Sequence, residues 1–294
     1  MRHFLLIPHL KIHNANAMSS PYTIGFPAMT AWLGAVHALQ RKLKQQGCDL
    51  NLNKVAVSCH DFNLQTYKGR GDFVHSIVGT ANPLDKDGNR PAFIEEARCH
   101  LEVSLLIEIE SSSKRQRDQL LELVNGIVAS MKFTSGDVLS AKPCTIFNFD
   151  DDEDQSQQLR PILNKLMLGH VLIERRDLVI QSMQDGKDAL DSVLDYLKVT
   201  HSSIQDEDGK VTWTSKRKAQ GWLVPIAVGF QGISELGHAK NQRDVNTLHR
   251  FAESVLTLGE FVMPYRIESI DQLLWQYHVD LENNLYLCQN QNTH

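Results

Sequence analysis

Apolar residues in the first half of the chain follow the pattern of strands in four places. Residues 3–10 (HFLLIPHL) are almost continuously apolar, and residues 54–66 alternate in part between apolar and polar. Residues 98–110 (RCHLEVSLLIEIE) alternate well. Alternation and short apolar runs are typical of strands, so we predict three strands here and a fourth over residues 137–149.

Two other segments repeat with the spacing of a helix. Apolar residues recur every three or four positions in residues 28–46, with Gly47 where a helix cap belongs, and again in residues 115–132. The order is strand, helix, strand, strand, helix, strand, which is the ferredoxin-like pattern that RNA-recognition domains share. We therefore expect an α+β fold in which residues 1–149 form a ferredoxin-like (RRM-like) domain.

A turn-rich stretch separates the second and third predicted strands. Residues 67–93 contain several glycines, two prolines and the pair Asp87-Gly88, which favours a two-residue hairpin turn. We expect a thumb hairpin inserted into the domain at this point. Lys68 and Arg70 lie in the insertion, where a flexible basic hairpin suits contact with a nucleic-acid backbone. An ordinary mobile surface loop explains the same two residues equally well.

The second half of the chain opens with an acidic run at residues 150–154, which is typical of a solvated linker. Beyond it we predict a smaller, mostly helical C-terminal domain over residues 155–294. Its predicted parts are helices over 155–200, a polar loop over 201–220, a short apolar segment over 222–226, and further helices over 243–260 and 268–278.

The net charge of −5 is unevenly distributed along the chain. Residues 1–142 carry 16 Lys and Arg against 13 Asp and Glu, a net of +3, whereas residues 143–294 carry 14 against 22, a net of −8. This balance is unlike that of a free DNA-binding domain, which is strongly basic. The first half suits contact with a phosphate backbone, and we expect such a chain to hold RNA together with partner proteins.

Apolar runs and cysteines bear on the location of the protein. No apolar run reaches the ~20 residues that a bilayer crossing needs, and the apolar start lacks a small-residue cleavage site. We therefore expect neither a membrane segment nor a signal peptide. The five cysteines are widely spaced and form no CxxC pair. This pattern favours a reducing cytoplasm over a disulfide scaffold.

The usual motifs for catalysis and cofactor binding are missing from the sequence. We find no Gx4GK[ST] phosphate loop, no HExxH and no GxSxG, and we expect no cofactor. Two pairs, Cys59-His60 and Cys99-His100, fall on predicted neighbouring strands, where a zinc site is conceivable. Adjacent strand residues point to opposite faces, so one pair does not easily supply two ligands to one metal. We expect no metal, with the cysteines in the core and the histidines on the open face of the sheet.

Several residues suit single-stranded RNA. Residues 14–20 are predicted to form a small-residue loop before the first helix, whose Asn, Ser and backbone N–H groups suit an anion; an ordinary connection explains it equally well. His60 and His100 suit stacking on bases or contact with phosphates. Arg41 lies at a helix end, where complementing the helix dipole is the simpler interpretation. Trp222 follows a basic cluster and suits base stacking, although a core role is commoner.

Four stretches together carry a resemblance to a known family. They are LLIPHLKIHNANAMSSPYTIGFPAMTAWLGAVHALQR (5–41), EEARCHLEVSLL (95–106), GWLVPIAVG (221–229), and FAESVLTLGEFVMPYR with DQLLWQYH (251–266 and 271–278). The sequence resembles the type I-F CRISPR-associated subunit of the Csy complex that binds the 5′ handle of the guide RNA, of the Cas-five family. The resemblance spans nearly the whole chain, and its first stretch is the most specific.

The resemblance implies a non-catalytic subunit with a ferredoxin-like domain, a thumb hairpin and a smaller second domain. Its implied partners are the crRNA 5′ handle, the large subunit, the backbone subunits of the type I-F complex and, through the assembled complex, target DNA. Gly136 stands where the superfamily has a glycine-containing turn that contacts RNA, here with a single glycine. The residues carried forward as RNA-binding are Asn14, Asn16, Ser19, Ser20, His37, Arg41, His60, Lys68, Arg70, Arg98, His100, Gly136, Trp222 and Arg266.

Two other functions stay open from the sequence. Some relatives in other CRISPR subtypes are endoribonucleases that cut precursor crRNA, and this chemistry needs a general base near a 2′-hydroxyl. His37, His60 and His100 are available for that role. The third possibility ignores the resemblance and gives the ferredoxin-like domain protein contacts alone.

Overall fold

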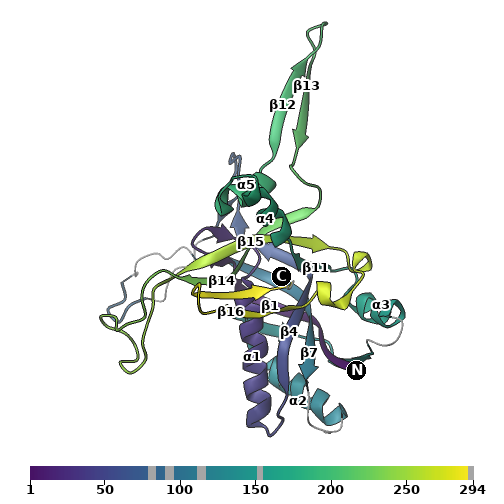
Figure 1. Ribbon diagram of the computed structural model, residues 1–294, viewed down its shortest axis with the longest axis vertical. Coiled ribbons are helices and arrows are strands. Elements are labelled where there is room, and N and C mark those ends of the chain that lie inside the picture. Colours follow the sequence, from purple (N-terminus) through teal and green to yellow (C-terminus); the bar gives the residue numbers. More distant parts are fainter. Residues whose placement is uncertain (79–83, 90–95, 111–116, 151–154, 291–294) are drawn as a thin grey trace.

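The computed structural model describes residues 1–78, 84–89, 96–110, 117–150 and 155–290 (Figure 1). Within these residues, one sheet of eleven strands runs through both halves of the chain. Its order is β11-β15-β14-β17-β16-β4-β7-β1-β9-β8, with β10 paired to β1 as well. Among the described residues, no helix has the length and apolar character that a bilayer crossing requires.

Four strands form the centre of the N-terminal half. β1 (Arg2–Asn16) lies between β7 (Arg98–Glu110) and β9 (Gly136–Ser140), and β4 (Asn51–Leu64) lies on the far side of β7. All of these neighbours are antiparallel. The predicted strand over 98–110 coincides with β7 and is confirmed. The predicted strand over 137–149 is instead two strands, of which β9 is the first and β10 (Thr145–Phe149) the second.

Two helices cover one face of these strands. α1 (Met29–Gln45) and α2 (Arg117–Ala129) bury their apolar sides against the sheet, with Trp32 and Val124 fully enclosed. Both helices were expected from the spacing of their apolar residues, and both are confirmed within the described chain. The strand residues beneath them alternate, so that every second side chain of β1 and β7 reaches this core. They are Leu5, Ile7, Leu10, Ile12, Cys99, Leu101, Val103, Leu105, Ile107 and Ile109.

The opposite face of the sheet is covered at one end only. There Phe4, Leu6 and Leu106 pack against α3 (Gln155–Leu166) and a short 3-10 turn, Ile270–Gln272. The remainder of that face, toward the other end of β1, β4 and β7, carries polar residues and is described below. Within the described residues, these N-terminal strands therefore have one face covered by helices and one that is covered at one end.

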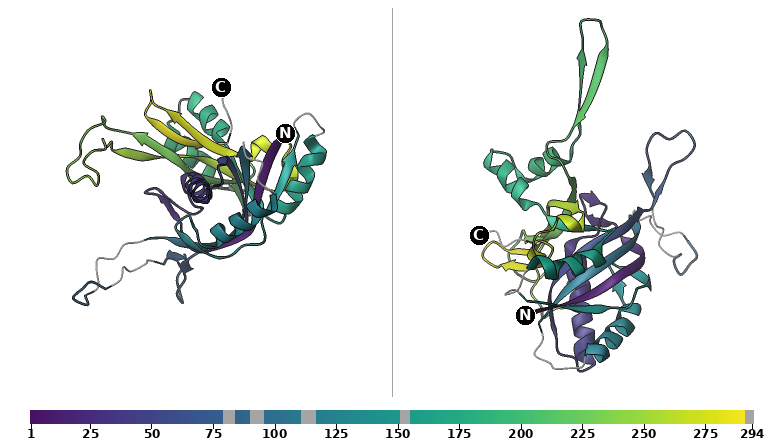
Figure 2. Two further views of the ribbon diagram at one scale, coloured as in Figure 1. Left: turned by 90° about the horizontal axis from the view of Figure 1, so that it is seen from below. Right: turned by 90° about the vertical axis from the view of Figure 1, so that its right-hand side faces the viewer.

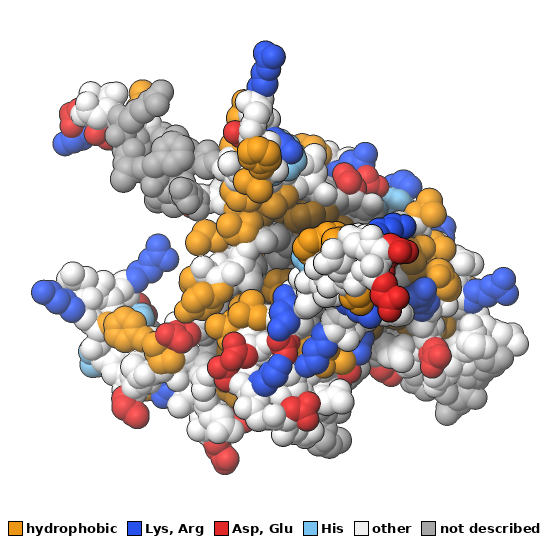
Figure 3. Space-filling view, turned by 90° about the horizontal axis from the view of Figure 1, so that it is seen from above, with side chains coloured by type: hydrophobic (Ala, Val, Ile, Leu, Met, Phe, Trp, Pro, Cys, Tyr) orange, Lys and Arg blue, Asp and Glu red, His pale blue; other side chains and the backbone are white. Residues whose placement is uncertain are grey.

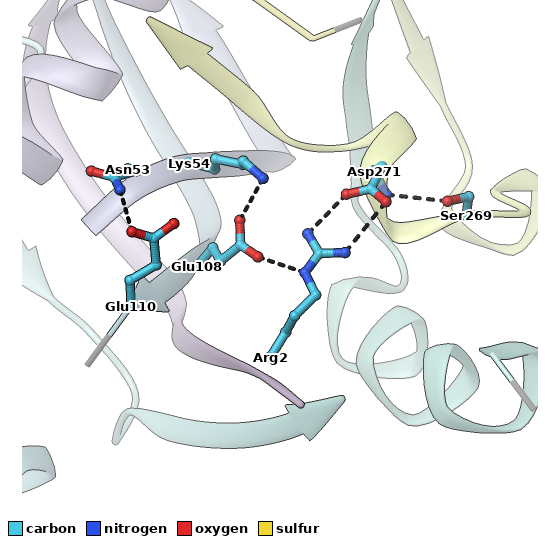
Figure 4. Close-up of polar contacts among 7 residues, drawn as sticks. All are labelled: Arg2, Asn53, Lys54, Glu108, Glu110, Ser269 and Asp271. Atoms are coloured by element: carbon cyan, nitrogen blue, oxygen red, sulfur yellow. Dashed lines mark hydrogen bonds and ion pairs between the residues drawn. The ribbon is translucent and has the colours of Figure 1, made fainter. Parts of the chain in front are cut away.

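An ion-pair network ties the first strand to the last third of the chain (Figure 4). Arg2 Nε lies 2.5 Å from Glu108 Oε1, and Arg2 Nη2 donates to Asp271 Oδ1 at 2.8 Å, across 269 positions of sequence. Lys54 Nζ lies 2.9 Å from the other Glu108 oxygen. Burial opposes ionisation of Glu108, but the hydrogen bonds and charges of Arg2 and Lys54 outweigh it and lower its pKa.

The prediction of a mostly helical C-terminal half is wrong. The second half of the predicted helix over 243–260 is β15 (Ala252–Val262), and the segment predicted as helical over 268–278 ends in β16 (Trp275–Asp280). These strands pair with β14 (Trp222–Gly232) and β17 (Leu285–Gln289). β16 then joins β4 through the pair Trp275 and Val55, which makes the sheet continuous across both halves.

Sheet pairing, not local periodicity, decides the structure of β15. A Cβ on Gly259 would lie 2.8 Å from Cδ1 of Leu172 in β11 (His170–Glu174), so glycine at this position leaves room for the Leu172 side chain between the paired strands. Leu258 is fully buried and lies opposite Pro225 of β14. Helix-like spacing in a short apolar segment is a weak signal when a neighbouring strand supplies hydrogen bonds and burial.

Helices do occur earlier in this half, in the region predicted as helical over 155–200. They are α3, α4 (Arg176–Gln184) and α5 (Ala189–Leu197), with β11 between the first two. The expected polar loop over 201–220 is wrong, because β12 (Thr200–Gln205) and β13 (Val211–Lys216) form a hairpin that stands clear of the rest (Figures 1 and 2). Its turn contains Gly209 at φ 79°, a conformation that glycine adopts without strain.

The predicted loop over residues 14–20 is also wrong. β1 continues to Asn16, where it pairs with Arg98, and a small hairpin follows from β2 (Met18–Ser20) and β3 (Thr23–Ile24). The reason is a bulge at Asn14, whose φ is 61°, because it lets the strand bend and resume pairing at Ala15 instead of ending.

The turn-rich insertion is described only in part. β5 (Thr66–Tyr67) pairs with β6 (Ser76–Ile77), and this short hairpin projects from the body in the right-hand view of Figure 2. Further along, Asp85 accepts hydrogen bonds from the N–H groups of Asp87 and Asn89 and closes the expected turn. Residues 79–83 and 90–95 lie outside the described chain, as do residues 151–154 of the acidic run.

Candidate nucleic-acid interface

Four histidines line the open face of β1, β4 and β7, and we call them the histidine strip: His9, His13, His60 and His100. Strand alternation explains why they share a face, because His60 and His100 follow the buried Cys59 and Cys99 by one residue. The prediction that these cysteines lie in the core and the histidines on the open face is confirmed. Burial raises the pKa of both thiols to about 12.

A bulge in β1 between Ile7 and Leu10 places its two histidines on this face. The pairing with β7 shifts between Ile7 and Leu10 and again between Ile12 and Ala15. His9 has a φ of 51°, an uncommon value for a residue other than glycine. Each bulge adds an unpaired residue. The first turns His9 outward, and regular alternation after it turns His13 outward as well; the second lets Ala15 return to the core.

The strip consists of two stacked pairs. The His9 and His60 rings lie 4.3 Å apart at an interplanar angle of 19°, and the His13 and His100 rings lie 4.4 Å apart at the same angle. The two rings of each pair lie nearly parallel, so each pair forms a flat, ordered unit. Flat rings on an open sheet face are what RNA-recognition domains use to stack unpaired bases.

The first pair is held by a buried hydroxyl and a carboxylate. Ser104 Oγ accepts the His9 backbone N–H at 3.0 Å and lies 2.7 Å from His60 Nε2. Glu102 Oε1 lies 2.7 Å from His9 Nδ1, and this hydrogen bond lowers the pKa of Glu102. Burial, with a smaller contribution from His9, lowers the pKa of His60 to about 4. His60 is therefore an uncharged ring at neutral pH.

The second pair joins the amide groups at the end of β1. The Asn14 backbone N–H donates to His100 Nδ1 at 3.2 Å, and Gln65 Nε2 donates to Asn14 Oδ1 at 3.1 Å. Gln65 Nε2 also lies 3.3 Å from His100 Nε2. The structure thus brings together Asn14, His60 and His100 of the predicted residues, on one face of three adjacent strands.

Other predicted residues near this end have local hydrogen-bond partners. The Asn16 side chain bonds both the carbonyl and the N–H of Met18, at 3.2 and 3.0 Å. Ser19 and Ser20 both bond the Thr23 hydroxyl, at 2.9 and 2.7 Å, and Ser20 is buried. Arg98 pairs with Glu96. These groups shape the β2–β3 hairpin and the strand end.

Gly136 packs against β1 with no room for a side chain. A Cβ there would lie 2.5 Å from Ile12 Cγ2 and 2.8 Å from the His13 carbonyl oxygen. The two residues before it, Thr134 and Ser135, have φ values of 48° and 68° and form the tight turn between β8 (Lys132–Phe133) and β9. This turn touches the strand that carries His13.

The remaining predicted residues are dispersed. His37 and Arg41 lie on the solvent side of α1, 3.3 Å apart, and α1 covers the opposite face of the sheet from the histidine strip. Lys68 and Arg70 are exposed between β5 and β6. Arg266 is exposed in the 3-10 turn Pro264–Arg266, with its guanidinium 5.8 Å from the ring centroid of Tyr265.

Trp222 is the one predicted residue not yet described. It begins β14 and lies beside a separate pocket. Its ring contacts His170 at 5.2 Å and Phe261 at 5.0 Å between centroids. His60 lines the same pocket. The pocket therefore adjoins the histidine strip.

Sequence reasoning missed His9, His13, Gln65 and Glu102 as members of the site. A strict two-residue period continued from the buried Leu5 and Ile7 would put both His9 and His13 in the core. The bulge between Ile7 and Leu10 moves both of them to the open face. Pro8 was a signal for a bulge beside His9, whereas no comparable signal marks the bulge at Asn14. No group of three or more His, Cys, Asp or Glu side chains within the described residues could hold a metal ion.

Comparison with known proteins identifies the chain. The family model described as CRISPR-associated protein, Cas_Csy2, matches residues 5–288. A CRISPR-associated protein Csy2 from Pseudomonas aeruginosa (strain UCBPP-PA14) is 32% identical over 307 positions, which cover 96% of this chain and 93% of that protein. The class is thus a CRISPR-associated protein, a Csy subunit of the type I-F kind. Within that class, the chain belongs to the Csy2 family.

Proposed function

We propose that this chain is a non-catalytic subunit of the type I-F surveillance complex that binds the 5′ handle of the crRNA. One observation carries the proposal: two stacked histidine pairs lie exposed in part on the open face of β1, β4 and β7. Unpaired RNA bases stack on flat rings in this kind of position, and amides such as Asn14 and Gln65 suit base edges or 2′-hydroxyls.

The same proposal assigns the N-terminal half to the ferredoxin-like (RRM-like) class. The order β4-β7-β1-β9, all antiparallel, with α1 and α2 on one face, supports this assignment. In such a domain the helix-free face of the sheet is the one that takes RNA. We propose that the histidine strip lies on that face. We further propose that the insertion over 67–93 is a thumb that reaches along the guide RNA.

Charge supports binding within an assembly. The net charge of +3 on residues 1–142 supplies few phosphate contacts, and phosphate contacts dominate the affinity of free nucleic-acid binders. We therefore assign much of the assembly energy to protein contacts with the large subunit and the first backbone subunit. The resulting ribonucleoprotein reads target DNA by base pairing, with the protein holding backbone and shape.

The endoribonuclease alternative has less support. A general base works best when its pKa is near the working pH, and burial holds the pKa of His60 at about 4. Its Nε2 also lies 2.7 Å from Ser104. A stacked and weakly basic imidazole suits RNA contact better than proton abstraction.

The test is the affinity of a handle RNA for the chain co-purified with its large-subunit partner, at fixed salt. Replacing both His13 and His100 by alanine removes one stacked pair, and we expect the dissociation constant to rise about tenfold, since stacking of one base is worth about 1–3 kcal/mol. His278→Ala, an exposed histidine of β16, is the matched control and leaves the affinity unchanged. An unchanged affinity in the double variant contradicts the site. If the co-purified chain binds no handle RNA at all, the proposed function fails.

A further inference from the structure

A pocket of about 460 Å³ opens beside the histidine strip, where β4 is paired with a strand on one side only. β11 pairs with β4 at Ser58 and Cys59, and β16 pairs with it at Lys54 and Val55. Within the described residues, the part of β4 that follows Cys59 pairs with β7 alone. The gap is bordered by the β2–β3 hairpin and by the start of β14. Its lining includes Ser19, His60, Asp61, Phe62, His170 and Trp222.

Trp222 forms a fixed aromatic wall of this pocket. Its side chain is 54% exposed although two other rings hold it, with His170 at 75° and Phe261 at 48° to its plane. An exposed tryptophan that is already ordered loses little entropy when a flat ligand stacks on it. Hydrophobic side chains gather on the face from which the β12–β13 hairpin rises, with Lys and Arg side chains among them (Figure 3).

The polar groups of the pocket select against phosphate. Asp61 is exposed and lines it with a carboxylate, which repels a phosphate and accepts hydrogen bonds from the N–H groups of a base. His60 lines it as an uncharged ring, and Ser19 adds a hydroxyl. An aromatic wall with a few hydrogen-bonding groups matches the face and the edge of a nucleobase.

We propose that this pocket holds a single unstacked nucleobase, with its ribose, of the RNA that the histidine strip binds. The base lies against Trp222 and directs its N–H groups toward Asp61. The volume is within the range of small-ligand pockets and exceeds what a lone base needs, which leaves room for the sugar. Lys216 and Arg217 are exposed and precede Trp222 by six and five positions in the chain, and we assign them to the flanking phosphates. This inference rests on the proposed function.

The experiment uses the complex reconstituted with a synthetic guide RNA that carries 2-aminopurine at one handle position at a time. We expect one position whose fluorescence changes on assembly because the base stacks in the pocket. Trp222→Ala abolishes that change and weakens handle binding about tenfold, whereas Trp222→Phe, which keeps a ring, retains most of both. Trp213→Ala is the control, because Trp213 is 70% exposed on the β12–β13 hairpin. Asp61→Asn weakens binding of the same position less than Trp222→Ala does.

Three outcomes overturn the inference. If guide RNA is bound and Trp222→Ala behaves like the unchanged protein at every position, the pocket holds no base while the proposed function stands. If Trp222→Ala releases a protein subunit and leaves the RNA signal intact, the occupant is an apolar side chain of a partner. If the reconstituted complex takes up no guide RNA, both the inference and the proposed function fail.

Discussion

The two faces of the central strands carry residues of opposite kinds although one backbone builds both. On the face beneath α1 and α2, alternate residues such as Leu101 and Val103 are buried and apolar. On the other face, their neighbours His100, Glu102 and Ser104 hold hydrogen bonds and stacked rings. The covered face serves stability, and we assign binding to the open face. Substitutions on the two faces should therefore separate folding from RNA affinity.

The largest effect is expected from the covered face. Trp32 is fully buried between α1 and the sheet, and Trp32→Ala should lower the free energy of unfolding by about 3–5 kcal/mol because it leaves a large cavity. Urea denaturation followed by circular dichroism measures this loss. Trp213→Ala, on the exposed hairpin, should change the stability by less than about 0.5 kcal/mol. Equal losses in the two variants would refute the assignment of the core.

A second prediction tests the contact between β9 and the strand that carries His13. Gly136→Ala should lower the free energy of unfolding by about 1–3 kcal/mol, because its Cβ would lie within 3 Å of Ile12, the His13 carbonyl and Ala15. Gly126→Ala is the matched control. Gly126 is exposed in α2 with nothing within 4 Å, so alanine there should raise stability by about 0.5–1 kcal/mol. Changes of the same sign would count against this packing.

The smallest effect belongs to the open face and depends on pH. The pKa of His60 is lowered from 6.5 to about 4 in the folded chain, so the unfolded state binds more protons between these values. Stability should fall as the pH drops from about 6.5 to about 4, and His60→Asn should remove that part of the slope. Glu102 and Glu108, whose pKa values are lowered from 4.5, lose their contributions only as the pH falls through that value, so the slope between about pH 6.5 and 5 reports on His60. Thermal denaturation at several pH values measures the slope; an unaltered slope in the variant contradicts the burial of His60.

Sequence patterns predicted the N-terminal half better than the C-terminal half, for a physical reason. In residues 98–110 and 28–46 the apolar period agrees with the final burial, so strand and helix follow directly. In β15 the period suggested a helix, and only pairing with β11 and β14 across long sequence distances decides the strand. The strands of the β12–β13 hairpin have no buried face to give the sequence an apolar pattern, because all but one of their residues are exposed.

The candidate site was predictable in residue type but not in arrangement. His60 and His100 follow from strand alternation alone. The positions of their partners His9 and His13 depend on the bulge between Ile7 and Leu10, because a shift of one residue moves every later side chain to the other face. Trp222 was recognised as a possible stacking residue, whereas the pocket beside it forms only when β2, β4 and β14 meet.

The pairing of β16 with β4 has a consequence for how the chain is made. Val55 and Lys54 receive their outer neighbour only from Trp275 and Gln276, more than two hundred positions later. During synthesis this part of the edge of β4 is therefore unpaired until nearly the whole chain has left the ribosome, and an unpaired apolar strand edge recruits other chains. Contacts this distant in sequence also slow folding. Yield in cells should thus depend on chaperones and translation rate more than the stability of the finished sheet suggests.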